Sequence, residues 1–413
     1  ETNMKLILKA DHIIDGIGAS SSERDAVLIE DGRIIAIAKP EVFGSAPDAE
    51  VINVPGGTIL PGFVEVHSHM HCSASPSAFE DLANDSRNEL IMRSVESVRM
   101  ALLSGVTTMR DLGSLNEIAF DIKNAINTGI IPGPHLLVTG TPITTTGGHC
   151  HMFGTEADTL EEAVTAVRNQ VKLGADWIKI MSTGGRFTPR TNPKMPQYTT
   201  EILRAVVQDA ERLGVKVAAH CHGALGVKNC VDAGVHNLIH ATWMSSDPGS
   251  GYDYDPAVAD QIAEKNIYVD PTIATGALRE ERDPGWLART LEGAFDDLDR
   301  RYEILRDMWD RGVKFVTGLD SGMNYMQFGD YAWVPRLMVE KLGISPTDAI
   351  VCGTRISAEC LGIIEETGTV EPGKRADIVI VKGNASEDIR ALHDVDTIIK
   401  SGMVIKKAGS TNF

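Results

Sequence analysis

The feature that most constrains the fold of this chain is a regular alternation of short apolar segments with helical segments across its middle. Segments of strand-like composition occur eight times, and helical patterns separate most of them. We predict strands at residues 63–69, 106–111, 135–140, 177–183, 215–222, 237–242, 267–272 and 314–320. Eight such units in roughly 250 residues are typical of an α/β TIM (β/α)8 barrel. A doubly wound open sheet is the alternative, but no Gly-x-Gly-x-x-Gly turn follows any of these strands.

Both ends of the chain have a different, β-rich character. Strands are predicted at 5–9, 26–29 and 33–37, and later at 377–383 and 395–402. The pair Asp31-Gly32 is typical of a tight hairpin. We predict a small β-sandwich domain formed by both chain ends, from residues 1–59 and 365–413, with the barrel of residues 60–364 between them.

Charge and cysteine usage narrow the class of partner. The 413 residues carry a formal net charge of -18, which argues against nucleic acid or an anionic membrane as a partner. No apolar run is long enough to span a membrane, and no signal-peptide core follows the first residues, although earlier removal of a signal peptide stays open. Six cysteines without a CxxC pair indicate reduced thiols and a cytoplasmic location.

Two histidines at the end of the first barrel strand indicate a metal site. His67 and His69 follow the apolar stretch 61–66. Residues i and i+2 of a strand point to the same face, so both imidazoles can reach one ion. A His-x-His pair is weak on its own, because surface and core histidines are common.

Polar residues at the ends of other predicted strands strengthen this interpretation. In a TIM barrel the chemistry takes place at the carboxyl ends of the strands. Neutral imidazoles and carboxylates suit zinc, and also manganese, cobalt or iron. The residues at these ends are Lys179, His220, His240 and Asp320.

Lys179 is the unusual member, because its neighbours 177–181 are apolar and an ammonium is costly to bury. One interpretation is a partner carboxylate. The other is a neutral amine, with its pKa lowered by burial and nearby metal charge, that reacts with carbon dioxide to give a metal-bridging carbamate. The spacing alone leaves both interpretations of Lys179 open.

Asp320 is either a loop-anchoring carboxylate or, beside metal-bound water, a ligand and general base.

These segments together resemble the amidohydrolase superfamily, essentially from end to end. Residues 62–69 resemble its strand-one signature, 105–111 its second strand, and 368–377 its return into the small β domain. Residues 178–185 and 147–149 are most similar to the prolidase-like branch, which cleaves dipeptides and N-acyl amino acids.

The resemblance implies a binuclear metal-dependent hydrolase with two divalent ions, expected to be zinc. The more buried ion would be held by His67, His69 and Asp320, and the outer one by His220 and His240, with carboxylated Lys179 as the bridge. The implied reaction is cleavage of an amide bond in a small carboxylate-bearing substrate, such as a dipeptide or N-acyl amino acid, by attack of a metal-bridging hydroxide. His149 would contact this substrate.

The loop after the fourth predicted strand, residues 185–194, is basic and overhangs the same end of the barrel. Two dications, a carbamate, Asp320 and a hydroxide leave a local charge of about +1, which favours an anionic substrate group. We therefore predict that Arg186 or Arg190 binds a substrate carboxylate through two parallel hydrogen bonds. The alternative is a solvated basic loop with no role in binding.

Two further side chains are candidates for substrate binding. Tyr198 lies just beyond the basic loop and is predicted to polarise the scissile carbonyl. His222 shares strand parity with His220, so we predict that it lines the mouth of the site and touches substrate.

Other functions remain as alternatives. The same chemistry could act on a carbamate, a urea or a lactone. A mononuclear deaminase would carry a glutamate three residues after His220, where this chain has Gly223. A catalytically inactive scaffold would have lost metal ligands, and all six residues are present. We expect a small molecule to be the substrate, and a homo-oligomer by analogy alone.

Overall fold

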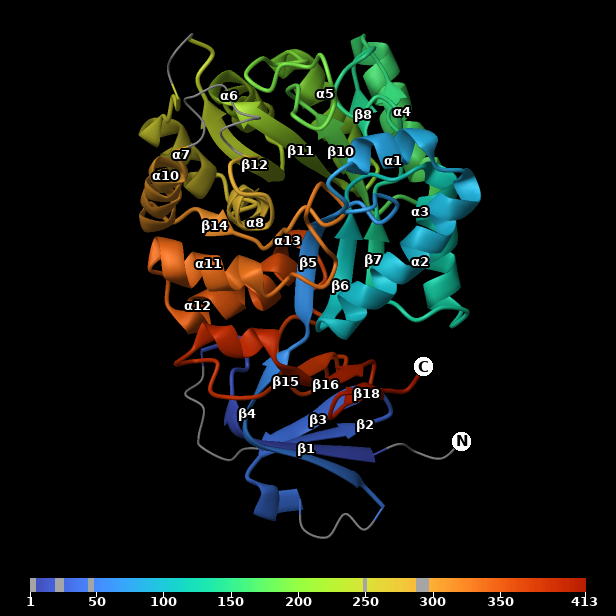
Figure 1. The fold of residues 1–413 in the computed structure, drawn as a ribbon, viewed down its shortest axis with the longest axis vertical. Helices are drawn as coiled ribbons and strands as arrows, with labels where there is room; N and C mark the ends of the chain where they lie inside the picture. The colour runs from blue at the N-terminus through green and yellow to red at the C-terminus, as the bar shows by residue number, and fades with distance from the viewer. Residues whose placement is uncertain (1–4, 19–25, 44–47, 248–250, 287–296) are drawn as a thin grey trace.

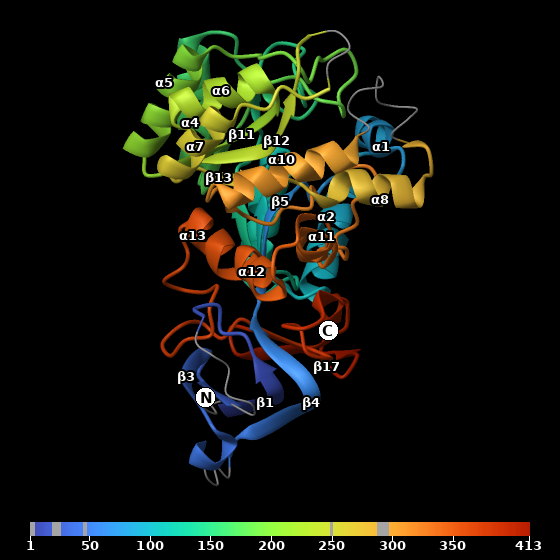
Figure 2. The same ribbon diagram turned by 90° about the vertical axis from the view of Figure 1, so that its left-hand side faces the viewer.

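The structure is a computed structural model, and it describes residues 5–18, 26–43, 48–247, 251–286 and 297–413. Two regions are evident in Figures 1 and 2. The first strands and the last strands of the chain lie together at one end, and the middle of the chain forms the larger region at the other. One set of buried apolar side chains lies within the smaller region. A larger set fills the other region and also includes Val379, Val381 and Ile398 of the smaller sheet, so the two regions pack against each other.

The smaller region is one eight-stranded sheet in the order β18-β17-β16-β15-β4-β1-β2-β3. Strand β4 joins the two chain ends, because it pairs in parallel with β1 and antiparallel with β15. The predicted hairpin joins β2 and β3, with Asp31 and Gly32 both at positive φ. The strands are β1 (Lys5–Ile13), β2 (Ala26–Glu30), β3 (Arg33–Ala38), β4 (Glu50–Pro61), β15 (Ile378–Val381), β16 (Val395–Lys400), β17 (Met403–Lys407) and β18 (Ser410–Thr411).

The larger region contains parallel strands in two sheets, in the orders β5-β6-β7 and β14-β13-β12-β11-β10-β8-β9. These strands are β5 (Phe63–Ser68), β6 (Val106–Asp111), β7 (His135–Val138), β8 (Ile143–Thr144), β9 (Thr155–Glu156), β10 (Trp177–Met181), β11 (Lys216–Gly223), β12 (Asn237–Met244), β13 (Tyr268–Asp270) and β14 (Lys314–Phe315). Each of the eight predicted strands overlaps an observed strand, and β8 and β9 are additional.

Main-chain hydrogen bonds link the two parallel sheets in two places. Between β7 and β10, the Asp176 nitrogen donates to the Val138 oxygen at 2.9 Å. Between β5 and the segment after β14, the Val66 nitrogen donates to the Thr317 oxygen at 3.1 Å. The prediction of an α/β protein with parallel strands is therefore confirmed.

Helices separate the parallel strands, and α11 and α12 lie at the end of these strands that faces the eight-stranded sheet (Figures 1 and 2). Thr159 is the N-cap of α4, and Glu162 completes a capping box with it. The helices are α1 (Ala78–Asn84), α2 (Arg87–Leu103), α3 (Asn116–Asn127), α4 (Leu160–Leu173), α5 (Thr200–Arg212), α6 (Ala224–Ala233), α7 (Pro256–Glu264), α8 (Ala274–Arg282), α10 (Leu298–Asp310), α11 (Trp333–Leu342), α12 (Pro346–Val351) and α13 (Ser357–Leu361). Short turns of 3-10 or π helix are η1 (Pro40–Phe43), η2 (Cys352–Ile356) and η3 (Ile389–His393). Within the described ranges, no helix is both long and apolar enough to cross a bilayer.

The two regions meet at Gly62, where β4 passes into β5. A Cβ at this position would lie 2.1 Å from the Thr107 hydroxyl, so only glycine fits. The Gly62 nitrogen donates to the Asp377 carbonyl at 2.9 Å, next to the start of β15. The buried Asp377 carboxylate accepts hydrogen bonds from Arg375 Nε at 2.7 Å and from the Ser401 nitrogen at 2.9 Å. One carboxylate thereby ties the returning chain to the junction.

Candidate active site

The predicted metal ligands meet at one end of the parallel strands. They line a single pocket although they come from five different segments. His67 and His69 lie on β5, Lys179 on β10, His220 on β11, His240 on β12 and Asp320 just after β14. All six side chains are buried.

His67, His69 and Asp320 form a compact inner group. Asp320 Oδ1 lies 3.2 Å from His67 Nε2 and 3.4 Å from His69 Nε2. The two Nε2 atoms lie 3.3 Å apart. Three potential ligand atoms therefore converge on one point.

Hydrogen bonds on the far side of each imidazole fix which nitrogen faces this point. His67 Nδ1 contacts Asp270 Oδ2 at 2.8 Å, and His69 Nδ1 contacts the Gly113 carbonyl at 2.9 Å. The Nε2 atoms are left for a metal. Such partners set the tautomer and orientation of metal-binding histidines.

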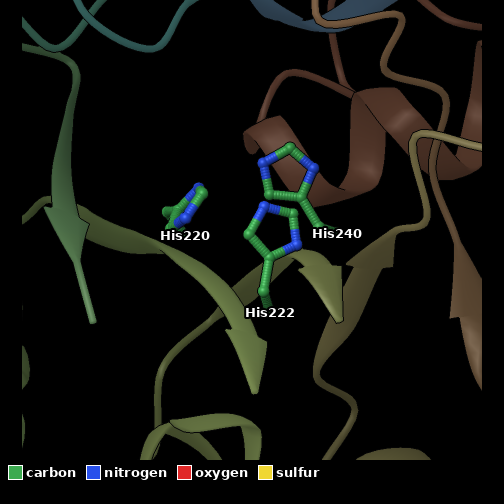
Figure 3. A group of neighbouring side chains, drawn as sticks. All are labelled: His220, His222 and His240. Atoms are coloured by element: carbon green, nitrogen blue, oxygen red, sulfur yellow. The ribbon is translucent and has the colours of Figure 1, made fainter. Parts of the chain in front are cut away.

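His220 and His240 form an outer group, and in each ring a hydrogen bond occupies one nitrogen and leaves the other for a metal. His220 Nε2 contacts the Gly184 carbonyl at 3.0 Å, which leaves its Nδ1 for a ligand. His240 Nδ1 contacts the Thr272 hydroxyl at 2.9 Å, which leaves its Nε2. Nitrogen atoms of His220, His222 and His240 lie within 4.8 Å of one another, and Figure 3 shows the three rings gathered with His222 and His240 face to face.

The electrostatics of the pocket favour metal-binding forms of these side chains. Burial lowers the pKa of His67, His220 and His240, which keeps the imidazoles neutral near pH 7. Burial alone would raise the pKa of Asp320, but His67 and His69 hold it below its usual range, so the carboxylate stays ionised. Neutral imidazoles beside an ionised carboxylate are the donor set that zinc prefers, so the residues fit a divalent metal.

Lys179 lies among these groups with only 1% of its surface exposed. No hydrogen bond or ion pair joins its ammonium to any residue that the structure describes. Burial lowers the pKa of Lys179 to about 8, although the charge of Asp320 opposes this shift. The partner carboxylate that would explain a buried lysine is thus absent from the described residues, and the amine is partly neutral near physiological pH.

Backbone packing explains why glycine precedes the Asp320 loop. A Cβ on Gly318 would lie 2.1 Å from Asp270 Oδ2 and 2.6 Å from the Cβ of His67. Asp320 itself adopts a φ of 65°, an uncommon value for a side chain other than glycine. The backbone at the end of β14 is therefore shaped around the histidine–carboxylate pair.

The predicted substrate contacts divide into two groups. His149, Arg186 and His222 line the pocket, and the His149 ring lies 4.4 Å from that of His220. The structure does not bring Arg190 or Tyr198 to it. Arg190 is exposed, and the buried Tyr198 hydroxyl donates to the Ala157 carbonyl at 2.7 Å. Its phenol is committed to holding the chain near α4.

Sequence reasoning missed the partners of the histidines and part of the pocket wall. Asp270 ends β13. A polar residue at a strand end is the signal that identified the candidate metal ligands, so the same signal could have identified Asp270. Gly184 acts through its carbonyl, which no pattern of side chains reveals. The wall also includes Arg279 and Arg301 and the apolar side chains Met244, Trp286 and Leu298.

The sequence profile of the amidohydrolase family matches residues 58–406, and the chain belongs to this family. This confirms the resemblance drawn from the strand-end motifs. The chain is accordingly a hydrolase acting on C–N bonds, with the TIM-barrel-type fold of that family.

Individual relatives act on several kinds of substrate. Ochratoxinase of Aspergillus niger is 26% identical over 391 residues, which span 85% of this chain and 76% of that protein. The structure of a Xaa-Pro dipeptidase with methionine bound in its active site superimposes with a TM-score of 0.85 at 29% identity, covering 97% of this chain and 100% of that one. Molinate hydrolase shares the fold, with a TM-score of 0.83 at 22% identity, covering 98% and 95% of the two chains.

Proposed function

We propose that this protein is a binuclear metal-dependent hydrolase that cleaves the amide bond of a small carboxylate-bearing substrate, such as a dipeptide or an N-acyl amino acid. The observation that carries the proposal is Lys179. Its buried amine has no hydrogen-bond or ion-pair partner among the described residues and lines the same pocket as the inner and outer histidine groups. A carbamate formed on this amine would supply the missing negative charge and two ligand oxygens.

The metal ligands follow from this assignment. The inner ion would be held by His67, His69 and Asp320, the outer ion by His220 and His240, and both by carboxylated Lys179. Zinc suits this mixture of imidazole and carboxylate donors. When bound, two such ions lower the pKa of water and polarise a carbonyl oxygen.

Asp320 would move the proton during cleavage. Its Oδ1 is shared by the two inner histidines at 3.2 and 3.4 Å, and its carboxylate is held ionised. An ionised carboxylate at the centre can accept a proton from the attacking water and deliver it to the departing amine. Attack and loss of the amine then give one carboxylic acid and one free amine.

His149, Arg186 and His222 would bind substrate. His149 Nδ1 is buried without a partner among the described residues, which suits a group that hydrogen-bonds to a bound molecule. The Xaa-Pro dipeptidase relative holds a free amino acid in its active site. The positive charge of exposed Arg186, which lines the pocket here, would favour entry of an anionic substrate.

Deamination fits this pocket poorly. The glutamate that would shuttle protons would stand at Gly223, where even a Cβ would lie 2.2 Å from the Lys194 carbonyl oxygen. A larger side chain therefore requires the basic loop to move. Carbamates, ureas and lactones remain the alternative substrates, because the same attack serves each of them.

The proposal extends to the architecture of the two domains, the cellular location and the oligomeric state. Residues 60–364 would form a closed (β/α)8 barrel, and residues 1–59 and 365–413 a β-sandwich. All six cysteines are buried and unpaired, which suits the reducing cytoplasm. The homo-oligomer remains a prediction by analogy.

The test is hydrolysis of a panel of dipeptides, N-acyl amino acids, carbamates, ureas and lactones by enzyme of measured metal content. We expect wild type to bind about two metals per chain and to release free amino acids. Lys179→Ala should neither bind two metals nor release amino acids. Turnover confined to carbamates, ureas or lactones would keep the metal site and reject the substrate. Release of ammonia at one metal per chain would reject both.

A further inference from the structure

Besides Lys179 and Arg186, the pocket is lined by Arg279 and Arg301. Arg279 is far from the basic loop in the order of the strands. Arg279 lies on α8, which follows β13, whereas the basic loop follows β10. Strands β11 and β12 separate β10 from β13 in the sheet. Arg279 lines the same pocket as His67 and Asp320, and its charge helps to hold the pKa of Asp320 low.

The terminal nitrogens of the Arg279 guanidinium are available to a ligand. Its Nε donates to the Asn324 carbonyl at 3.3 Å, and its central carbon lies 4.9 Å from the centre of the Trp286 ring. Neither terminal nitrogen has a hydrogen-bond or ion-pair partner within the described part of the chain. A partly buried guanidinium in this state is suited to receive a carboxylate through two parallel hydrogen bonds.

The other buried arginine of the pocket is already committed. Arg301 donates its terminal nitrogens to the main-chain carbonyls of His240, Ala241 and Pro271. These bonds hold the chain at the end of β12, where His240 and Ala241 have positive φ. Arg301 therefore supports the strand, whereas Arg279, the other arginine on this side of the pocket, can receive a ligand.

Helix α8 is fastened to the chain that follows Asp320. Arg282 donates to the Tyr325 carbonyl, and the Tyr325 hydroxyl donates to Asp283 at 2.9 Å. With the Arg279–Asn324 bond, these contacts join the end of α8 to residues 324–325. The position of the guanidinium relative to the proton-carrying carboxylate is thereby fixed.

An apolar wall lies beside this cation. Met244 is buried, and Tyr252, Trp286 and Leu298 pack against it. All four line the pocket, and Trp286 lies against the Arg279 guanidinium. A carboxylate site and an apolar site are thus adjacent, which matches an amino acid whose carboxylate and large side chain share one carbon atom.

We propose that Arg279 binds the α-carboxylate of the amino acid that departs as the amine, and that Met244, Tyr252, Trp286 and Leu298 receive its side chain. The substrates are then amides of amino acids with bulky apolar side chains. This inference rests on the proposed function. It identifies the part of the substrate near Asp320 as the amino acid that leaves as the free amine. Water is consumed, the C–N bond breaks, and the products are an acid and the free apolar amino acid.

The test compares N-acetyl-L-phenylalanine with N-acetylphenethylamine, which has the same ring but no carboxylate, using metal-loaded wild type, Arg279→Gln and Arg282→Gln. We expect Arg279→Gln to lower kcat/KM on the acid at least tenfold more than on the phenethylamide, chiefly through KM. Arg282→Gln, on the same helix but paired with Asp330, should change both substrates by one common factor. Calorimetry should also show weaker binding of free phenylalanine to Arg279→Gln.

The apolar wall is tested with Leu298→Ala and Met244→Ala. Each should reduce the preference for N-acetyl-phenylalanine over N-acetyl-alanine about tenfold. The inference would be overturned if kcat/KM fell equally on N-acetyl-phenylalanine and N-acetylphenethylamine, and equally on N-acetyl-phenylalanine and N-acetyl-alanine, while binding of phenylalanine stayed unchanged. These residues would then be structural. Absence of any amide hydrolysis by wild type would instead overturn the proposed function.

Discussion

His67 Nδ1 lies 2.8 Å from Asp270 Oδ2, and both side chains are fully buried. The other oxygen, Asp270 Oδ1, accepts a hydrogen bond from the Thr272 nitrogen at 3.0 Å. The Thr272 hydroxyl in turn contacts His240 Nδ1 at 2.9 Å. A single carboxylate therefore orients one histidine of the inner group directly and one of the outer group through Thr272.

We expect Asp270→Asn to weaken binding of both metal ions by about 10- to 100-fold, because it removes the charge that fixes His67 and disturbs the support of His240. Thr272→Ala should weaken chiefly the outer ion. The measurement is competition with a chelator of known affinity, followed by metal analysis. Unchanged affinities in Asp270→Asn would contradict this account.

Carboxylation of Lys179 should depend on pH and on carbon dioxide. The pKa of Lys179 is lowered to about 8, so the amine is protonated below that pH and neutral above it. Only the neutral amine reacts with carbon dioxide, so reconstitution of metal-free enzyme with zinc should accelerate as pH rises from 6.5 to about 8.5. The rate of return of activity is measured at constant dissolved carbon dioxide. A rate that does not change when carbon dioxide is removed would exclude the carbamate.

His222 should act on substrate and leave the metal content unchanged, although its ring stacks on that of His240 at 4.4 Å. We expect His222→Asn to retain about two metals per chain and to raise KM severalfold. His220→Asn is the matched comparison and should lose about one metal, because its Nδ1 faces the outer site. Loss of metal from both variants would make His222 a ligand.

Asp377 should stabilise the junction between the two regions in a pH-dependent way. The carboxylate is buried, and although burial raises its pKa, His135 and Arg375 lower it to about 2. A lowered folded-state pKa contributes stability above the ordinary value near 4, and this contribution is lost as pH falls through about 2. Asp377→Asn should therefore cost about 2–3 kcal/mol at pH 7 and progressively less below pH 4.

Urea unfolding at a series of pH values measures this difference in the free energy of unfolding. Asp388→Asn is the control, because Asp388 is exposed and, among the described residues, forms its ion pair with neighbouring Arg390 on the surface. Its cost should stay within about 0.5 kcal/mol. Equal effects of the two substitutions would show that the buried carboxylate does not hold the junction.

The positions of the strands were predictable because periodicity and turn residues are local signals. Strands β5, β6 and β10 begin where the sequence predicted them. The strand predicted at 314–320 is regular only at Lys314–Phe315. Beyond it the chain turns around Gly318 to carry Asp320 at positive φ, a departure that packing against Asp270 and His67 imposes.

The metal-ligand candidates were predictable because each stands at the end of an apolar strand. Their supports were not, because these contacts join residues far apart in sequence: His67 and Asp270 are separated by 203 positions. The same limit applies to Tyr198. Its place after the basic loop indicated substrate binding, whereas its hydroxyl contacts Ala157, and Arg279 was missed because α8 had no motif of its own.

We propose that cleavage of the amide bond requires two metal ions and Lys179 as their shared ligand. The most direct measurement is titration of metal-free enzyme with zinc, in the presence of bicarbonate, while release of phenylalanine from N-acetyl-phenylalanine is followed. We predict activity that rises until two equivalents are bound in wild type and no activity at any zinc concentration in Lys179→Ala. Full activity without metal, or an unaffected Lys179→Ala variant, would contradict the account.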